Sequence, residues 1–356
     1  MHHDDPALPP DPARRASLHC AWRAALGLSL ATPWPAAMAR TGQPEAAGAA
    51  TSGASGEPAA SAAAGASAAP SVPRLPRVSS GRIERLANFT SRHVDARHVD
   101  VWLPADYDAG RRHKVVYMHD GQMLFDAGTT WNGKSWNLSG AMGRLLREGR
   151  IPDTLVVAIW SHERLRHAEY FPQKVLDYLA PALRDEFVTG ALAGRPRADD
   201  YLRFIVEELK PEIDRRYHTR PGREHTLVMG SSMGGLISIY AMNEYPQVFA
   251  GAAGLSTHWM GRMTPNDELP RAACDYLREH LATAEGHRLY MDHGDQGLDA
   301  GYAPYQAAVD QVVASRWPEH AWLSRQFGGT THDETSWAAR VHIPLLFLLL
   351  PRAVAS

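Results

Sequence analysis

The sequence predicts an α/β fold with a mostly parallel central sheet and helices on both faces. Strand-like apolar runs alternate with amphipathic, helix-like segments along the globular part of the chain, from about residue 82 to residue 351. Several of these runs are continuously apolar instead of alternating with polar residues. Such runs are typical of strands buried on both faces of a sheet. Regular alternation of strand and helix then indicates parallel strands joined by covering helices.

Eight short runs are predicted as strands because they are rich in apolar residues and end in turn-forming residues. In chain order they cover residues 82–91, 97–104, 113–121, 153–160, 225–232, 250–259, 287–295 and 321–329.

Five segments are predicted as helices: 199–217, 234–249, 271–281, 302–317 and 332–349. The first places apolar residues at steps of four along one face, and Pro211 within it is expected to kink or split the helix. The last contains the very apolar run Ile343–Leu350. A membrane span needs about 20 such residues, so we interpret this run as a buried helix.

The first 81 residues differ in composition from the rest. Arg14 and Arg15 precede a mildly apolar stretch that ends in the cleavage-like pattern Ala37–Ala39. This pattern predicts a signal peptide over 1–39 and export to the periplasm or the medium. The alternative is an alanine-rich tail, which Arg23 favours. Residues 40–81 are mostly Ala, Gly, Ser and Pro, too poor in large apolar side chains to fold, and are interpreted as a linker before the domain at 82–351.

Composition excludes some classes of function. The formal net charge is −2 and there is no long basic run, so nucleic acid and an anionic membrane surface are not expected partners. The two cysteines, Cys20 and Cys274, have no zinc-ligand spacing and cannot form a disulfide framework.

The most informative motif follows the run that ends at residue 232. Residues Gly230–Gly234 read GSSMG, a G-x-S-x-G pattern at a strand-to-helix junction. In such a turn Ser232 occupies strained backbone that exposes its Oγ, and both glycines avoid collisions in the turn. A phosphate-binding loop is excluded because no G-x-x-x-x-G-K-[ST] pattern and no nearby lysine are present. An ordinary glycine-rich turn is the remaining alternative.

A serine nucleophile needs a base and an acid, expected in the chain order Ser, Asp or Glu, His. His332 is the preferred base because it follows the last predicted strand and a glycine-rich approach. The competing downstream histidines are His258, His280, His287, His293, His320 and His342. Asp299 is the preferred acid because it lies deeper in the loop after its strand, and Asp295 is the alternative. Asp292 is still within the strand and is expected to orient backbone.

An oxyanion hole needs two backbone N–H groups. We expect one from Met233, directly after the serine, and the other at or near Gln122 in the loop after the third strand. Several aromatic or imidazole side chains could line an acyl or alcohol pocket, with core packing as the alternative for the tryptophans. They are Trp131, Trp136, Trp160, His258 and Trp259.

With these pieces in order, the chain resembles the putative-esterase family of α/β-hydrolases, which includes feruloyl esterases, enterochelin esterases, S-formylglutathione hydrolases and mycolyltransferases. The matching segments are "VVYMHDGQMLFD", "EYFPQ", "VMGSSMGGLIS", "GLSTHW", "YMDHGDQGLDAGYAPYQ" and "THDETSWAARVHIPLLFLL". The resemblance implies an α/β-hydrolase fold with Ser232 as nucleophile, Asp299 as acid and His332 as base. It also implies no metal or organic cofactor.

The expectation is therefore an exported serine esterase that acts on a small-molecule or polysaccharide-linked ester through an acyl-enzyme. One alternative is acyl transfer to a sugar or lipid hydroxyl. Another is a non-catalytic relative that binds a carbohydrate or siderophore.

Overall fold

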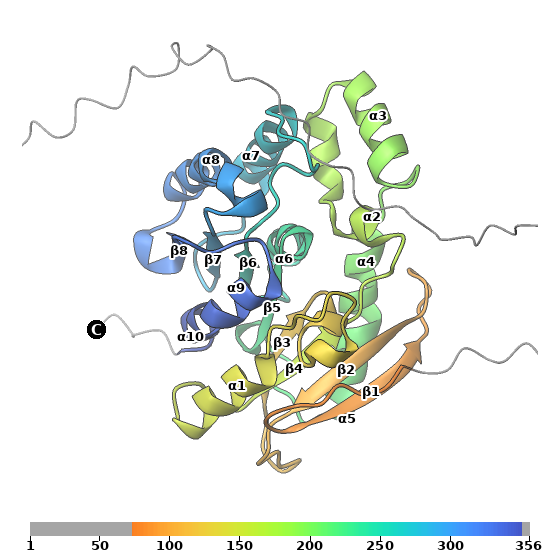
Figure 1. Cartoon of the computed structure of the whole chain (residues 1–356), viewed down its shortest axis with the longest axis vertical. Helices are drawn as coiled ribbons and strands as arrows, with labels where there is room; N and C mark the ends of the chain where they lie inside the picture. The colour runs from red at the N-terminus through yellow and green to blue at the C-terminus, as the bar shows by residue number, and fades with distance from the viewer. Residues whose placement is uncertain (1–72, 351–356) are drawn as a thin grey trace, which may run out of the picture. The chain divides into compact units, whose positions relative to one another are not determined.

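The computed structural model describes residues 73–350 and builds them around an eight-stranded sheet (Figure 1). The predicted signal peptide, most of the predicted linker and Cys20 lie outside these residues. The strand order is β1-β2-β4-β3-β5-β6-β7-β8. The strands are β1 (Arg82–Phe89), β2 (Arg97–Leu103), β3 (Lys114–Met118), β4 (Thr154–Ile159), β5 (Thr226–Ser231), β6 (Gly251–Leu255), β7 (Arg288–His293) and β8 (Trp322–Gln326).

The sheet is mostly parallel, as predicted. β2 pairs antiparallel with both β1 and β4, whereas all pairs among β3 to β8 are parallel. Each of the eight predicted strand runs contains one of the observed strands. The carboxyl ends of the six parallel strands therefore open at one edge of the sheet, where loops can bring side chains together.

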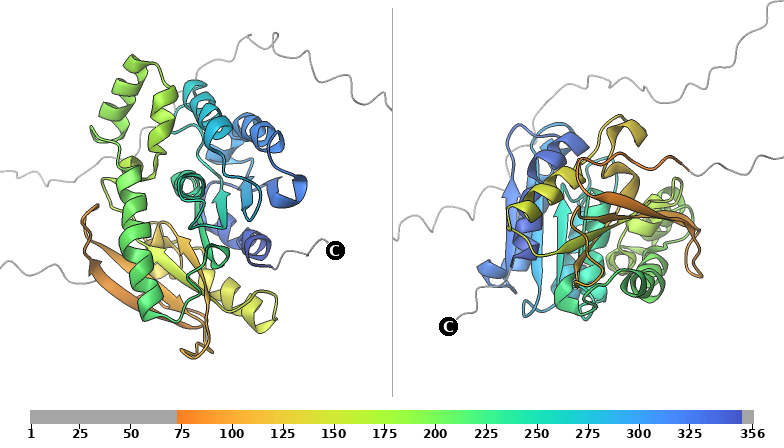
Figure 2. Two further views of the ribbon diagram at one scale, coloured as in Figure 1. Left: turned by 180° about the vertical axis from the view of Figure 1, so that it is seen from behind. Right: turned by 90° about the horizontal axis from the view of Figure 1, so that it is seen from below.

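Helices cover both faces of the sheet (Figure 2), which confirms the predicted fold class. On one face Val115 and Tyr117 of β3 belong to a core shared with α6 (Met233–Glu244), α7 (Glu268–His280) and α8 (Ala303–Ala314). On the other face Val116 and Met118 join a core with α1 (Leu138–Arg147), α9 (Glu334–Arg340) and α10 (His342–Leu349). Alternate residues of one strand thus contribute to two separate hydrophobic cores, one on each face of the sheet.

The helix predicted to kink or split at Pro211 changes its hydrogen-bonding pattern just before this proline. α4 (Ala198–Arg203) continues into a π-helical turn, Phe204–Leu209, and then into α5 (Lys210–Arg216). Proline has no N–H and its ring crowds the preceding turn. A π-helical turn is one of the recognised ways in which a helix absorbs such a disruption.

The segment predicted as one helix over 332–349 forms two, α9 and α10. The apolar run at its end lies in α10 and packs against β6 and β7, in agreement with the expected buried helix. Within residues 73–350 we find no helix whose length and apolar character suit a membrane crossing.

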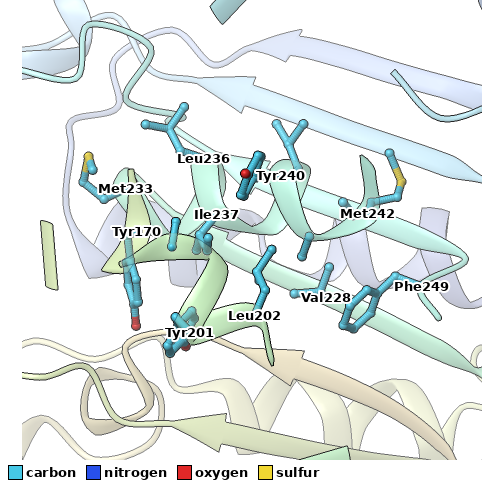
Figure 3. Packing of buried hydrophobic residues seen from close by; sticks show 14 of the residues in the cluster. Tyr170, Tyr201, Leu202, Val228, Met233, Leu236, Ile237, Tyr240, Met242 and Phe249 are labelled. Carbon is cyan, nitrogen blue, oxygen red and sulfur yellow. The ribbon is translucent and has the colours of Figure 1, made fainter. Parts of the chain in front are cut away.

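α6 is the most deeply enclosed helix around the candidate site. Its residues from Met233 to Asn243 are all buried. Figure 3 shows Met233, Leu236 and Ile237 of this helix in the cluster that also contains Tyr170 and Tyr201. A helix that is apolar all round must be packed on every side. The turn that begins α6 is therefore held rigidly.

The part of the predicted linker that the structure describes, residues 73–81, contacts the domain. Trp102 Nε1 donates a hydrogen bond to the carbonyl oxygen of Ser80 at 2.7 Å. The backbone N–H of Arg77 donates to Asp126 at 2.9 Å. These contacts extend the packed chain to the amino-terminal side of β1.

Candidate active site

Ser232 occupies the sharp turn between β5 and α6. Its backbone has φ 55° and ψ −124°, a region that residues other than glycine rarely adopt. A Cβ on Gly230 would lie 2.7 Å from the carbonyl oxygen of Gly234, so a side chain is excluded there. The N–H of Ser232 donates to the carbonyl oxygen of Leu255 at 2.8 Å. The turn therefore has the geometry expected from the GSSMG pattern.

His332 lies in the loop between β8 and α9, and its partner is Asp299. The distance from His332 Nδ1 to Asp299 Oδ1 is 2.6 Å. The other carboxylate oxygen of Asp299 accepts from Ser256 Oγ at 2.6 Å and from the N–H of Gly294 at 2.7 Å. Burial alone would raise the pKa of Asp299, but these hydrogen bonds lower it below its ordinary value. Asp299 is thus held as a carboxylate beneath the imidazole.

The other two candidate acids point elsewhere. Asp295 accepts from the N–H of Gly329 at 2.7 Å and so joins the loop after β7 to the loop after β8. Asp292 accepts from the N–H of Ser256 and pairs with Arg340 at 3.0 Å, in a fully buried position. The structure therefore brings Asp299, and neither of the others, to His332.

Ser256 is a supporting residue that the sequence did not single out. It follows β6 and has a positive φ of 43°. Its Oγ donates to Asp299 and accepts from Trp337 Nε1 and Arg340 Nη2, both at 3.0 Å. A buried carboxylate with satisfied partners keeps a fixed orientation. The signal that could have identified it is its place at the carboxyl end of a parallel strand.

Ser232 and His332 line one cleft of about 560 Å³. Of the residues expected to bind substrate, Trp131 and Trp136 also line it, and Trp131 is 80% exposed. The complete lining is Asp120, Gln122, Met123, Trp131, Asn132, Lys134, Trp136, Ser161, Arg166, Ser231, Ser232, His332, Asp333, Glu334 and Trp337.

The structure does not bring Trp160, His258 or Trp259 to this cleft. The indole of Trp160 faces β2, where its Nε1 donates to Asp100 at 3.0 Å and Arg85 stacks on the ring. Trp259 is buried, and its Nε1 donates to Gln306. Core packing therefore describes the surroundings of Trp259, whereas Trp160 is half-buried beside charged residues of β1 and β2.

His258 lies behind His332 and not on the cleft. Its ring is 6.5 Å from that of His332, centroid to centroid, and its Nδ1 is 2.5 Å from the hydroxyl of Tyr302. Burial, followed by the neighbouring His332, lowers the pKa of His258 to about 3, so the ring is neutral near pH 7. It therefore packs against the back of the predicted base.

The two residues expected to donate to the oxyanion both follow the carboxyl ends of parallel strands, at the same edge of the sheet. Met233 is the first residue of α6, so its N–H has no acceptor within the helix. Gln122 lies in a 3-10 turn, Gly121–Met123, that follows β3 and lines the cleft. Its side-chain amide exchanges two hydrogen bonds with Ser161, at 2.6 and 3.1 Å.

Charged pairs on the cleft were missed by the sequence reasoning. Arg166 binds Asp120 at 2.6 Å. Lys134 binds Asp333, the residue that follows His332, at 2.7 Å. Partners so far apart in the chain leave no periodic signal. All of them follow strands β3, β4 or β8, on the side of the sheet where functional residues of this architecture gather.

Other nucleophile and metal chemistries find little support among the described residues. No group of three or more His, Cys, Asp or Glu side chains gathers there in a way that could hold a metal ion. Cys274 is buried in α7, and burial raises the pKa of its thiol to about 11. A thiol with such a pKa is protonated near neutral pH and is a poor nucleophile.

A mostly parallel eight-stranded sheet with helices on both faces defines an α/β-hydrolase fold. The family model described as "Putative esterase" matches residues 91–342. The chain belongs to this family.

Curated relatives are distant. One is "Uncharacterized protein YbbA" of Bacillus subtilis (strain 168), 26% identical over 166 residues that cover 46% of this chain and 58% of that protein. Another is an endo-1,4-beta-xylanase/feruloyl esterase of Xylanibacter ruminicola, 21% identical over 271 residues. That match covers 73% of this chain and 30% of the relative. The chain thus spans less than two thirds of the length of either protein.

Solved structures share the fold at low identity. The enterobactin esterase FES from Shigella flexneri, solved in the presence of 2,3-di-hydroxy-N-benzoyl-serine, superposes with a TM-score of 0.56 and 18% identity. The match covers 78% of this chain and 61% of FES. A CE1 ferulic acid esterase from Anaeromyces mucronatus, in complex with ferulic acid, gives 0.50 and 18%, covering 78% and 95%.

Proposed function

We propose that this protein is a serine esterase that hydrolyses a carboxylic ester through Ser232, His332 and Asp299. The observation that carries the proposal is the hydrogen bond between His332 and Asp299 on the cleft that Ser232 also lines. Membership of the esterase family supports the same reaction.

In this mechanism Ser232 Oγ attacks the ester carbonyl carbon while His332 Nε2 takes its proton. Asp299 accepts the Nδ1–H of His332, which fixes the tautomer and stabilises the imidazolium. The N–H groups of Met233 and Gln122 stabilise the oxyanion of the tetrahedral intermediate. The C–O bond of the ester then breaks, and the departing alcohol takes the proton from His332. Water, activated by the same histidine, hydrolyses the acyl-enzyme and regenerates Ser232.

The cleft favours an ester that carries a flat ring. Trp131, Trp136 and Trp337 line it together, and aromatic side chains bind planar apolar groups well. Structural neighbours named as enterobactin and ferulic acid esterases are consistent with ring-bearing acids. We therefore propose a small-molecule or polysaccharide-linked ester as substrate. A panel of p-nitrophenyl and methyl esters, differing in acyl length and aromaticity, tests this preference.

Fluorophosphonate labelling tests the nucleophile. The wild-type protein should be labelled at Ser232 and should hydrolyse p-nitrophenyl acetate. Ser232→Ala should lose both properties while keeping its thermal unfolding temperature. Ser231→Ala is the adjacent-serine control. Ser231 also lines the cleft, but it ends β5 in regular strand backbone, and the variant should keep most of the activity. Equal loss in the two variants would contradict Ser232 as the single nucleophile.

A further inference from the structure

We propose that Arg166 is a positioning residue for the oxyanion-binding loop, and that it acts through Asp120. This inference rests on the proposed esterase function. It gives a role to the segment Arg166–Tyr170, which forms the short helix α2 after β4.

Asp120 immediately precedes the 3-10 turn that contains Gln122, and its backbone is strained. It has φ 55° and ψ 45°, the left-handed region that a residue with a side chain seldom adopts. Gly121 beside it runs against β4, where a Cβ would lie 2.5 Å from the carbonyl carbon of Ala158. A residue with strained backbone in a closely packed turn needs contacts from other elements to keep its conformation.

Arg166 and Tyr170 supply those contacts from one turn of helix. Arg166 Nε and Nη2 donate to the two carboxylate oxygens of Asp120 at 2.6 and 2.7 Å, a bidentate geometry. The N–H of Asp120 donates to the hydroxyl of Tyr170 at 3.3 Å. The Arg166 guanidinium also lies over the Tyr170 ring, 5.1 Å from its centroid. Side chain and backbone of Asp120 are therefore both held.

The helix that holds Asp120 is itself fixed to the sheet. Glu169 of α2 accepts two hydrogen bonds from Arg97, at 2.7 and 2.8 Å, and both side chains are buried. Arg97 is the first residue of β2. A second link joins the segment after β4 to the turn, through the two hydrogen bonds between Ser161 and Gln122. The oxyanion-binding loop is thus tied to a rigid support.

The pair also controls charge beside the nucleophile turn. A Cβ built on Gly234 would lie 3.4 Å from Asp120 Oδ2, so this carboxylate sits against the first turn of α6. An uncompensated negative charge there would oppose the negative charge that develops on the ester oxygen. Burial alone would raise the pKa of Asp120, but Arg166 lowers it below its ordinary value. Arg166 neutralises a carboxylate that stays ionised.

Kinetics of Arg166→Gln test the inference on p-nitrophenyl acetate. Misplacing the loop weakens binding of the transition state and leaves binding of the ester largely unchanged. We expect kcat to fall by roughly 10- to 100-fold with KM within about twofold. Inhibition by an alkyl trifluoromethyl ketone, which forms a tetrahedral adduct with the serine, should weaken by a similar factor. Arg164→Gln, an exposed arginine two residues earlier, is the matched control and should match the wild type.

A double variant separates charge from packing. In Arg166→Gln the Asp120 carboxylate is left unpaired, so adding Asp120→Asn should restore kcat by at least about threefold. Loss of packing alone would make the double variant slower than either single one. Arg166→Lys keeps the charge without the bidentate geometry and should be intermediate, and it serves if Arg166→Gln unfolds.

The outcomes distinguish this inference from the proposed function. A wild-type protein that neither reacts with fluorophosphonate nor cleaves any ester in the panel would refute the esterase proposal. An active wild type would overturn the role of Arg166 if kcat and ketone inhibition were unchanged in Arg166→Gln. A double variant no faster than Arg166→Gln would equally overturn it.

Discussion

At the scale of single residues, the division of labour among Asp292, Asp295 and Asp299 is decided by what each carboxylate accepts. Only Asp299 of the three accepts from His332. We expect Asp299→Asn to reduce kcat by up to about 10⁴-fold, because an amide at this position favours the wrong histidine tautomer. Asp295→Asn should cost far less, since the amide oxygen can still accept from the Gly329 N–H and this side chain makes no hydrogen bond to His332. Steady-state hydrolysis of p-nitrophenyl acetate by both variants measures the ranking.

The reverse ranking would move the acid to Asp295 and contradict the assignment. The sequence favoured Asp299 but kept Asp295 open, because both lie in one loop after β7 and differ only in reach. In the structure the direction of the loop brings Asp299 to His332. Gly297 has φ 60°, and the 3-10 turn Gly297–Gly301 carries Asp299 back under the imidazole. A local reversal of this kind depends on backbone dihedrals that residue type alone does not specify.

At the scale of elements, continuous apolar runs were sufficient to predict the strands, because a strand buried on both faces has few other compositions. The GSSMG turn was predictable for a similar reason, since a Cβ at Gly230 would lie 2.7 Å from the carbonyl oxygen of Gly234. The orientation of the tryptophan side chains was not predictable from the sequence. Trp160 follows β4 directly and yet faces β2, where Asp100 accepts a hydrogen bond from its Nε1. Pairs such as Asp120 and Arg166 join segments that are far apart in the chain. Neither segment carries a sequence pattern that predicts such a pair.

The loop that carries Trp131 is joined to the segment after His332 by two contacts. Lys134 binds Asp333 at 2.7 Å, and Asn132 donates to Glu334 at 2.9 Å. Asp333 also caps α9 by accepting from the N–H of Ser336. These contacts hold an exposed tryptophan at the cleft.

We expect Lys134→Met to raise KM for an aromatic ester by roughly two- to fivefold, the size typical of an exposed ion pair. The unfolding temperature should be unchanged, because the pair is exposed to solvent. Added salt should also raise the KM of the wild-type enzyme, since salt screens exposed ion pairs. Arg150→Met, which breaks a pair far from the cleft, is the control. A Lys134→Met enzyme with wild-type KM and wild-type salt dependence would show that the loop is held by other contacts.

At the scale of the whole molecule, buried neutral histidines predict sensitivity to acid. Burial lowers the pKa of both His119 and His258 from 6.5 to about 3. Between these values the unfolded chain binds protons that the folded chain does not, so stability is complete above pH 6.5 and declines as the pH falls toward 3. Each histidine should cost about 2 kcal/mol of unfolding free energy at pH 5 relative to pH 8.

Urea unfolding of the wild type and of His258→Gln at several pH values measures this effect. The variant can differ from the wild type at pH 8, but its stability should decline less between pH 6.5 and pH 4. His320→Gln, an exposed histidine, is the control and should decline like the wild type. Parallel curves for the wild type and His258→Gln would contradict a depressed pKa at this site.

The amino-terminal boundary of the folded unit gives the last prediction. The proposed signal peptide and residues 40–72 lie outside the described chain, and their composition predicts no contribution to a core. Residues 73–81 differ, because the carbonyl oxygen of Ser80 accepts from the Nε1 of Trp102, a fully buried side chain. Removing this acceptor leaves a buried donor unpaired, at a cost of about 1–3 kcal/mol.

A chain that begins at Pro73 should therefore unfold at the same temperature as one that begins at Arg40, with the same kcat on a soluble ester. A chain that begins at Arg82 should unfold several degrees lower, because it loses the bonds to Trp102 and Asp126 together. Thermal unfolding followed by circular dichroism compares the three. Equal temperatures for the Pro73 and Arg82 chains would show that residues 73–81 add nothing to the fold. A Pro73 chain less stable than the Arg40 chain would show that part of 40–72 packs on the domain.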